Sequence, residues 1–296
     1  MTYGQLGRRS FLKLAAAAAV VGAVSAEKIG LSRDNRKKDG IYKAISIGML
    51  PKGLSDADKF NLARKCGFEA IEAEPLGSLE AMREQGALAK EAGVPIHGLV
   101  FGGWGMPFSS SDPKIIEKGL AGMENAMRCA KAIGASTVLL VPGIVTEDVG
   151  YADAYKRSQN NIRKLLPIAR KLDVIIAIEN VWNKFLLSPI EFARYIDEFE
   201  SPNVRAYFDV GNVIINGYSQ DWIKTLGKRI VKLHVKDFKR DGYKWTNLFD
   251  GDVNWREVRK ALDEIGYAGF MTSELEGGDE AYLAGIAKRM DRIIAM

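Results

Sequence analysis

After Gly40 the chain alternates short runs of aliphatic and β-branched residues with longer amphipathic stretches, and the alternation repeats eight times. Strands connected through helices must pair in parallel with right-handed crossovers, and eight such units close into a barrel. The sequence therefore predicts an α/β fold, a single-domain (β/α)8 barrel over residues 41–296. An open doubly wound sheet is the alternative, but no Gly-x-Gly-x-x-Gly turn follows the first expected strand. The expected strands lie near residues 42–50, 68–74, 95–101, 136–142, 174–181, 204–210, 230–237 and 269–276.

The first 26 residues have the pattern of a signal peptide. Residues 8–13, Arg-Arg-Ser-Phe-Leu-Lys, precede an apolar run and the small-residue pattern Val-Ser-Ala that ends at Ala26. The paired arginines resemble a twin-arginine signal, although Gly7 stands where Ser or Thr is usual. We expect the twin-arginine export machinery as a partner and a periplasmic or secreted protein after cleavage near Ala26. A general secretory signal, or a signal retained as an anchor, are the alternatives.

Positive charge is concentrated before the expected barrel. The whole chain carries a formal charge of +5, of which residues 1–26 contribute +3 and residues 27–39 contribute +2. Residues 27–40 are therefore expected to form a basic linker, and the barrel itself is close to neutral. A neutral barrel lacks the basic surface by which proteins bind nucleic acid, so no nucleic-acid partner is expected.

The last four expected strands each end in a polar residue: Glu179, Asp209, His234 and Glu274. The carboxyl ends of parallel barrel strands meet at one rim, so these side chains should converge. A lone residue of this kind is more often a helix cap or an ion-pair partner, but four on successive strands point to a shared cation. Three oxygen ligands and one imidazole nitrogen suit Mn²⁺, Mg²⁺ or Co²⁺ and are compatible with Zn²⁺ or Fe²⁺. We expect Mn²⁺, although the ligands alone do not select the ion.

Four short motifs surround these residues: Ile-Glu-Asn at 178–180, Phe-Asp-Val-Gly-Asn at 208–212, His-Val-Lys-Asp at 234–237 and Ser-Glu-Leu-Glu at 273–276. With these motifs the chain resembles the xylose isomerase-like TIM barrel superfamily, in particular its sugar epimerase and hydroxypyruvate isomerase branch. The resemblance implies that the four residues bind one divalent metal. It also implies that Glu179 and Glu274 are catalytic and move protons between adjacent carbons of a sugar through an enediolate.

Two further residues are compared with the family. Arg240 matches an arginine that contacts substrate oxygen in the epimerases, which makes it a candidate for substrate binding. Asn212 stands three residues after Asp209, where these enzymes commonly carry a histidine. Asn212 is a candidate for substrate contact, and this departure argues against the family's specific substrates.

Other candidates for substrate binding follow from strand alternation and loop position. Lys236 and Glu276 lie two residues beyond His234 and Glu274, so both should point toward the mouth of the barrel, where a salt bridge is the alternative role. Trp104 and Trp182 follow the third and fifth strands and could form an apolar wall for a sugar, with loop packing as the alternative.

Several other residues have more limited implications. His97 lies early in its strand, away from the rim, and is expected to be structural, while alternation turns Lys232 into the base of the barrel. Cys66 and Cys129 lie on helices that are not neighbours, so we expect no disulfide. The segment 243–255 is expected to cover the mouth.

These observations favour a metal-dependent isomerase or epimerase of a non-phosphorylated sugar or sugar derivative. The alternative is a dehydratase or lyase that acts on an inosose or a 3-keto-glycoside at the same site. A non-catalytic sugar-binding barrel is less favoured, as is an abasic-site endonuclease, because such nucleases use histidine-rich metal clusters and this chain has two histidines. The sequence is compatible with a homo-oligomer and does not set its size.

Overall fold

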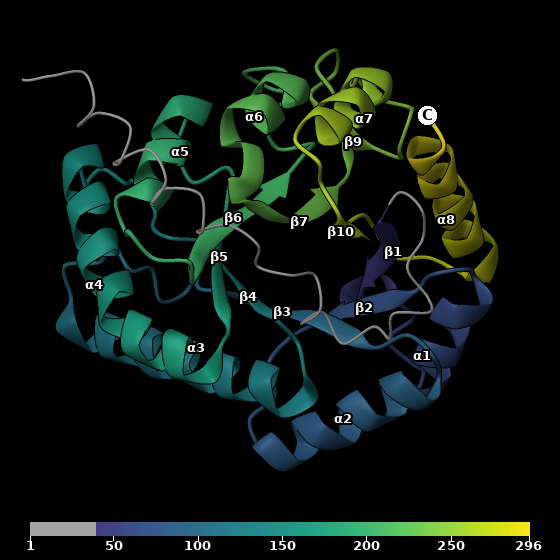
Figure 1. Ribbon diagram of the computed structural model, residues 1–296, viewed down its shortest axis with the longest axis horizontal. Helices are drawn as coiled ribbons and strands as arrows, with labels where there is room; N and C mark the ends of the chain where they lie inside the picture. The colour runs from purple at the N-terminus through teal and green to yellow at the C-terminus, as the bar shows by residue number, and fades with distance from the viewer. Residues whose placement is uncertain (1–39) are drawn as a thin grey trace, which may run out of the picture. The chain divides into compact units, whose positions relative to one another are not determined.

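The computed structural model describes residues 40–296, and the expected signal peptide and residues 27–39 lie outside the described residues. The described chain forms a closed parallel barrel with the strand order β1-β10-β7-β6-β5-β4-β3-β2 (Figure 1). This confirms the predicted (β/α)8 fold. The barrel strands are β1 (Ile41–Ser46), β2 (Ala70–Ala73), β3 (Ile96–Gly102), β4 (Thr137–Leu140), β5 (Ile175–Glu179), β6 (Val204–Asp209), β7 (Ile230–Val235) and β10 (Gly269–Ser273).

Eight α-helices surround the barrel (Figure 1), and none of the described helices is both long and apolar enough to span a membrane. The helices are α1 (Asp56–Lys65), α2 (Leu79–Glu91), α3 (Pro113–Ile133), α4 (Tyr151–Leu172), α5 (Pro189–Asp197), α6 (Ser219–Leu226), α7 (Trp255–Glu264) and α8 (Glu280–Ile294). Short 3-10 turns occur at Ile47–Met49 and Gly227–Arg229.

Local sequence signals determine where the helices begin and end. The hydroxyl oxygens of Ser55, Ser78 and Ser188 each accept a hydrogen bond from a backbone N–H in the first turn of α1, α2 and α5. Pro113 occupies the first position of α3, where its missing N–H is not needed, and Gly134 ends that helix in a left-handed conformation. These signals fix the helices that return the chain to the base of each following strand.

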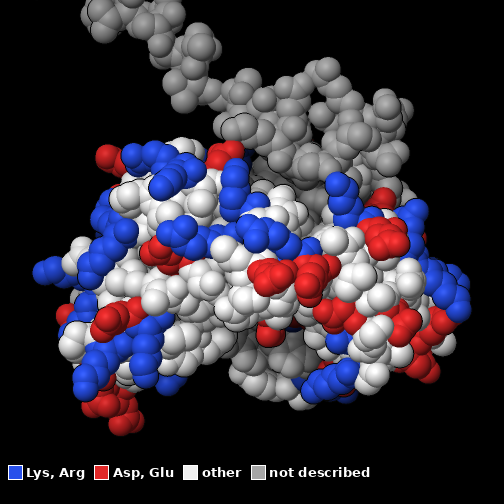
Figure 2. All heavy atoms as spheres, turned by 90° about the horizontal axis from the view of Figure 1, so that it is seen from below, with Lys and Arg blue, Asp and Glu red and all other residues white. Residues whose placement is uncertain are grey.

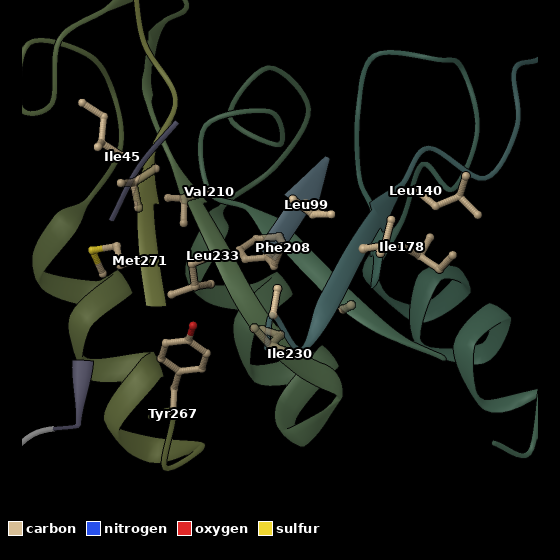
Figure 3. Close-up of a cluster of buried hydrophobic side chains, with 14 of the residues drawn as sticks. Ile45, Leu99, Leu140, Ile178, Phe208, Val210, Ile230, Leu233, Tyr267 and Met271 are labelled. Carbon is tan, nitrogen blue, oxygen red and sulfur yellow. The ribbon is translucent and has the colours of Figure 1, made fainter. Parts of the chain in front are cut away.

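The main hydrophobic core lies between the barrel and its helices. Figure 3 shows part of it, with side chains from neighbouring strands, including Ile178, Phe208 and Leu233. Because successive residues of a strand point to opposite faces, each of these places the next residue inside the barrel: Glu179, Asp209 and His234. Packing of the apolar outer face of each strand against the helices therefore turns the polar residues of that strand toward the barrel interior.

The two cysteines belong to this core and form no disulfide. Cys66 and Cys129 are both buried and free, as the sequence predicted. Burial raises the pKa of both thiols, so they behave as small apolar side chains.

The barrel interior contains polar contacts beside a small apolar cluster of Leu139, Ala177 and Tyr207. His97 Nε2 lies 3.0 Å from Thr272 Oγ1, and the imidazole stacks on Phe270 with ring centroids 4.3 Å apart. Lys232 donates to the carbonyl oxygen of His97 at 3.4 Å, and its ammonium lies 4.4 Å from the Phe270 centroid. Burial lowers the pKa of Lys232 to about 7. These contacts confirm that His97 is structural and that Lys232 points into the barrel.

The seventh strand is shorter than expected. The predicted strand 230–237 ends at Val235, and Asp237 begins a separate antiparallel hairpin of β8 (Asp237–Lys239) and β9 (Lys244–Thr246). The buried carboxylate of Asp237 explains why the strand ends. It accepts hydrogen bonds from residues that follow it in the chain and do not belong to the barrel strands. Its donors are the backbone amides of Phe238 at 2.9 Å, Phe249 at 3.0 Å and Val253 at 3.1 Å, and the Trp255 indole at 2.9 Å.

The outer surface carries charges of both signs. Figure 2 shows lysine and arginine side chains interleaved with aspartate and glutamate over the face in view. On that face of the described barrel, basic residues do not gather into a continuous stripe of the kind that binds a phosphate backbone.

Replacing Asp237 with Ala should lower the free energy of unfolding, measured in urea by circular dichroism, by about 3 kcal/mol, because three buried donors and one partly buried donor lose their acceptor. Limited proteolysis should cut the variant faster between residues 237 and 255. Asp241→Ala is the control, since Asp241 is exposed on the same hairpin. Equal stability of the two variants would contradict the role given to Asp237.

Candidate metal centre and adjoining cavity

Four side chains converge at the carboxyl-terminal rim of the barrel, as the sequence predicted. Glu179 and Asp209 end β5 and β6, His234 lies near the end of β7, and Glu274 follows β10. One ligand atom from each lies within 4.8 Å of all the others, so the group could hold a metal ion. The register explains the alignment, because Asp209 is paired directly with His234.

The imidazole of His234 is central to this cluster. Its Nδ1 atom lies 2.8 Å from Glu179 Oε1, 3.4 Å from Glu274 Oε2 and 4.0 Å from Asp209 Oδ2. All three carboxylates therefore face the same ring nitrogen. The other nitrogen, Nε2, lies 2.6 Å from Oε2 of Glu72, a buried residue of β2.

Burial and mutual repulsion alter proton affinity in the cluster. Burial raises the pKa of Glu179 to about 7 and also raises the pKa of Asp209. Burial would lower the pKa of His234, but the carboxylates of Glu72, Glu274 and Glu179 raise it well above its ordinary value. Glu179 and His234 therefore influence each other's proton affinity, because Oε1 and Nδ1 lie 2.8 Å apart.

Lys236 supplies a second positive charge. Its ammonium lies 3.0 Å from Asp209 Oδ2 and 2.5 Å from Glu274 Oε2. Burial raises the pKa of Glu274, but His234 and Lys236 outweigh this effect and lower it. The close approach depends on Gly211, where an added Cβ would stand 2.7 Å from the carbonyl oxygen of Lys236.

The donor set fits a divalent cation. Glu72, Glu179, Asp209 and Glu274 outnumber the two basic residues at the rim, His234 and Lys236, so the cluster retains excess negative charge. Among the described residues, buried Asp209 Oδ2 has the Lys236 ammonium 3.0 Å away as an ion-pair partner but no further hydrogen-bond donor. A buried carboxylate oxygen in this state is an available ligand.

Asn180 and Asn212 hold Asp209 in place. Asn180 accepts a hydrogen bond from the Asp209 amide and donates one to the Asp209 carbonyl oxygen, both at 2.9 Å. The Asn212 amide donates to Asp209 Oδ1 at 2.7 Å, and the Asn212 side chain donates to the carbonyl oxygen of Asn180 at 2.9 Å. Asn212 thus supports a candidate ligand directly.

A cavity of about 550 Å³ adjoins the cluster. It includes three residues singled out from the sequence, Lys236, Glu274 and Glu276, and three residues of the segment expected to cover the mouth. Of the two glutamates that converge at the rim, Glu274 has a side chain that is 40% exposed and Glu179 one that is 6% exposed. Glu274 is therefore the one that a ligand in the cavity can touch. The lining residues are Lys236, Trp245, Thr246, Asn247, Glu274, Leu275, Glu276, Gly277 and Tyr282.

An aromatic wall stands between this cavity and a second one of about 360 Å³. Trp182 stacks on Trp245 with ring centroids 4.8 Å apart and contacts Tyr243 at 5.6 Å. Its indole N–H donates to the carbonyl oxygen of Asn212 at 2.9 Å. The second cavity is mostly apolar and is lined by Asn180, Val181, Trp182, Lys184, Phe185, Leu186, Leu187, Asn212, Val213, Ile215, Asn216, Trp222 and Tyr243.

Two expected substrate residues line neither of these cavities. The Arg240 guanidinium donates to the carbonyl oxygens of Ile214 at 2.8 Å and Gly217 at 2.9 Å, and so braces the loop after β6. Trp104 is exposed in the turn after β3, apart from the aromatic wall. Their proposed contact with substrate stays a prediction.

Sequence reasoning missed three residues at or near the site, Glu72, Tyr207 and Tyr282, and it placed Trp245 and Asn247 there only as part of the segment 243–255. A signal existed for Glu72, since a glutamate between Ile71 and Ala73 in a buried strand must face the barrel interior. Glu72 lies within its strand and not at the end, so the strand-end pattern does not include it. The remaining residues reach the site through loop shape or across the barrel.

A family model described as the xylose isomerase-like TIM barrel matches residues 60–293. The chain belongs to this family. The matched segment contains most of the described barrel, including the four converging residues and the residues that line the cavity beside them. This agrees with the resemblance drawn from the short motifs.

Individual relatives are more distant. L-ribulose-5-phosphate 3-epimerase UlaE of Escherichia coli O1:K1 / APEC is 25% identical over 246 residues, covering 77% of this chain and 86% of that protein. A crystal structure of D-psicose 3-epimerase in the presence of D-fructose superposes with a TM-score of 0.73 at 18% identity, covering 86% of this chain and 100% of the other. The apo form of 3-keto-D-glucoside 4-epimerase YcjR from E. coli gives a TM-score of 0.73 at 16% identity, with coverage of 87% and 99%. The similarity to epimerases supports an enzyme of the sugar epimerase or isomerase kind.

Proposed function

We propose that the protein is a divalent-metal-dependent isomerase or epimerase of a non-phosphorylated sugar or sugar derivative. The observation that carries the proposal is the convergence of Glu179, Asp209, His234 and Glu274 within 4.8 Å, beside a cavity into which Glu274 is exposed. These four residues would hold the ion. The relatives named as sugar epimerases support the reaction class.

The proposed reaction moves a proton at a carbon next to a carbonyl group. A bound divalent ion supplies the Lewis acid that stabilises negative charge on the carbonyl oxygen. Glu274 takes or returns the proton where the substrate occupies the cavity, and Glu179 is the second carboxylate for the opposite transfer. Return to the other face of the same carbon gives epimerisation. Return to the former carbonyl carbon, with transfer of the neighbouring hydroxyl proton to the former carbonyl oxygen, gives isomerisation.

The charges of the cavity favour a substrate without phosphate. Of the described residues that line it, only Lys236 is cationic, and its ammonium is already paired with Asp209 and Glu274. Glu276 adds a further negative charge to the wall. A phosphate group binds where arginine, lysine or free backbone amides gather, so this lining suits hydroxyl groups better.

The second cavity favours a second candidate function, an elimination or epimerisation on a 3-keto-glycoside. It is mostly apolar and meets the metal cluster at Asn180 and Asn212, so an apolar aglycone could lie there while the sugar reacts. The same enolate that returns a proton can instead expel a leaving group from the next carbon. Release of the aglycone, measured by chromatography, would separate this function from proton exchange alone.

We also propose that the protein acts after export, because the twin-arginine pattern at Arg8 and Arg9 would direct a folded, metal-loaded barrel across the membrane. Changing both arginines to lysine should retain the protein in the cytoplasm, as measured by cell fractionation. Unchanged export of the variant would favour a general secretory signal.

The activity is tested by deuterium exchange. We expect the purified protein to incorporate solvent deuterium next to the carbonyl of one or more keto-sugars or 3-keto-glycosides, to lose this activity after chelation, and to regain it with Mn²⁺. The panel pairs each free sugar with its phosphate ester, and the free sugar should exchange faster. No exchange with any compound would count against the function, and preference for the esters would overturn the substrate class.

Glu274→Gln should lower kcat by roughly 10²–10⁴-fold, because it removes a group that transfers the proton. Glu276→Gln is the matched control, since Glu276 lines the same wall two residues away. It should mainly change KM. Turnover unaffected by Glu274→Gln would instead support a barrel that binds sugar without catalysis.

A further inference from the structure

We propose that Glu72, a residue of β2, is a positioning residue that holds the His234 imidazole with Nδ1 facing the metal. The inference rests on the metal centre proposed above and assigns a function to a residue outside the four ligands. Glu72 lies across the barrel from β7, 162 residues away in sequence from His234. It does not line the cavity beside Glu274, so it acts through the histidine.

The contact that carries this proposal is short and buried. Glu72 Oε2 lies 2.6 Å from His234 Nε2, and both side chains are 1% exposed. A carboxylate can only accept, so Nε2 must carry the proton that joins the two groups. A cation bound between the carboxylates that face Nδ1, those of Glu179, Glu274 and Asp209, would replace any proton on that atom. With its proton held on Nε2 by Glu72, the neutral imidazole then offers the Nδ1 lone pair to the cation.

Glu72 is itself held in one orientation. Its second oxygen accepts a hydrogen bond from the Tyr207 hydroxyl at 2.5 Å, and that hydroxyl lies 3.2 Å from Thr272 Oγ1. Thr272 in turn contacts His97 Nε2 at 3.0 Å. The Tyr207 ring packs on the His234 ring with centroids 4.3 Å apart. The imidazole is therefore held at Nε2 by Glu72 and packed against the Tyr207 ring at an interplanar angle of 46°.

The cost of burying Glu72 argues for a role beyond packing. A buried carboxylate is expensive unless it is paired, and the ion pair recorded for Glu72 among the described residues is the one with His234. An aliphatic residue could fill this space in β2 without that cost. Carboxylates that orient a metal-binding histidine typically change metal affinity by 10–100-fold when they are removed.

The two histidines of the chain make a direct test practical. The full-length protein, purified through a tag without histidine and labelled with ¹⁵N-histidine, gives signals from only two imidazoles, and His97→Gln assigns them. Zn²⁺ is the probe, because it is diamagnetic and compatible with this ligand set. In the zinc-loaded protein we expect the His234 proton on Nε2 and a zinc-dependent shift of Nδ1.

Three variants distinguish the hydrogen bond, the charge and simple folding. Glu72→Leu should lose the fixed Nε2 proton and bind Zn²⁺ about 10–100-fold more weakly by calorimetry. Glu72→Gln keeps an acceptor oxygen, so it should retain the tautomer and bind Zn²⁺ more tightly than the leucine variant. Thr137→Val is the matched control, because Thr137 is equally buried in the barrel and its hydroxyl has no hydrogen-bond partner among residues 40–296. It should bind zinc like the original chain.

The outcomes separate this inference from the proposed function. If the unaltered protein binds no divalent ion, the metal centre and the role of Glu72 both fail. If it binds Zn²⁺ and Glu72→Leu matches its affinity and tautomer, only the role of Glu72 fails. Should Glu72→Leu not fold, Tyr207→Phe removes the hydroxyl that orients Glu72 and should weaken zinc binding. Unchanged zinc binding and an unchanged His234 tautomer in Tyr207→Phe would overturn the proposal.

Discussion

The rim of this barrel concentrates negative charge where little water can reach it. Two like charges 4 Å apart repel by about 4 kcal/mol at an effective dielectric constant of 20. Glu179 and Asp209 are almost wholly buried there, so the fold can keep them only with nearby positive charge. In the described chain that charge comes from His234 and Lys236, two residues apart at the end of β7. The positive charges at the end of β7 thus offset the negative charges of the carboxylates on the other strands.

This arrangement depends on polar contacts that extend below the rim. Glu72, Tyr207, Thr272 and His97 form a continuous series of contacts across the interior, from the rim to the middle of the barrel. The residues come from four different strands, so the series also ties those strands together. Hydrophobic packing against the helices fixes the strands from outside, as Figure 3 illustrates, while polar contacts fix the side chains inside.

The fold and the four converging residues could be predicted because they depend on local pattern. Eight repeats specify the barrel, and parallel strands carry Glu179, Asp209, His234 and Glu274 to one rim by geometry alone. Helix limits followed from caps such as Ser78 and Gly134. Each of these inferences uses residues close together in sequence or a property shared by every strand.

The other features of the site depend on contacts between residues far apart in the chain, which the spacing of residues in the sequence does not reveal. Glu72 meets His234 only when the barrel closes, and Trp245 meets Trp182 only when the hairpin folds over the mouth. The break in the seventh strand was missed because Asp237 finds its donors up to 18 residues later. Arg240 lies six residues after His234, but its guanidinium is held by the carbonyl oxygens of another loop.

The hydrogen bonds that hold the hairpin to Asp237 also determine which of its residues can be substituted during evolution. Three of the four donors to Asp237 are main-chain amides, which every residue except proline provides. Side chains between residues 238 and 253 can therefore be exchanged without releasing the anchor. Three residues of this stretch line the cavity: Trp245, Thr246 and Asn247. Mutation of these residues can change the size of the sugar that the cavity accepts and leave the four converging residues unchanged.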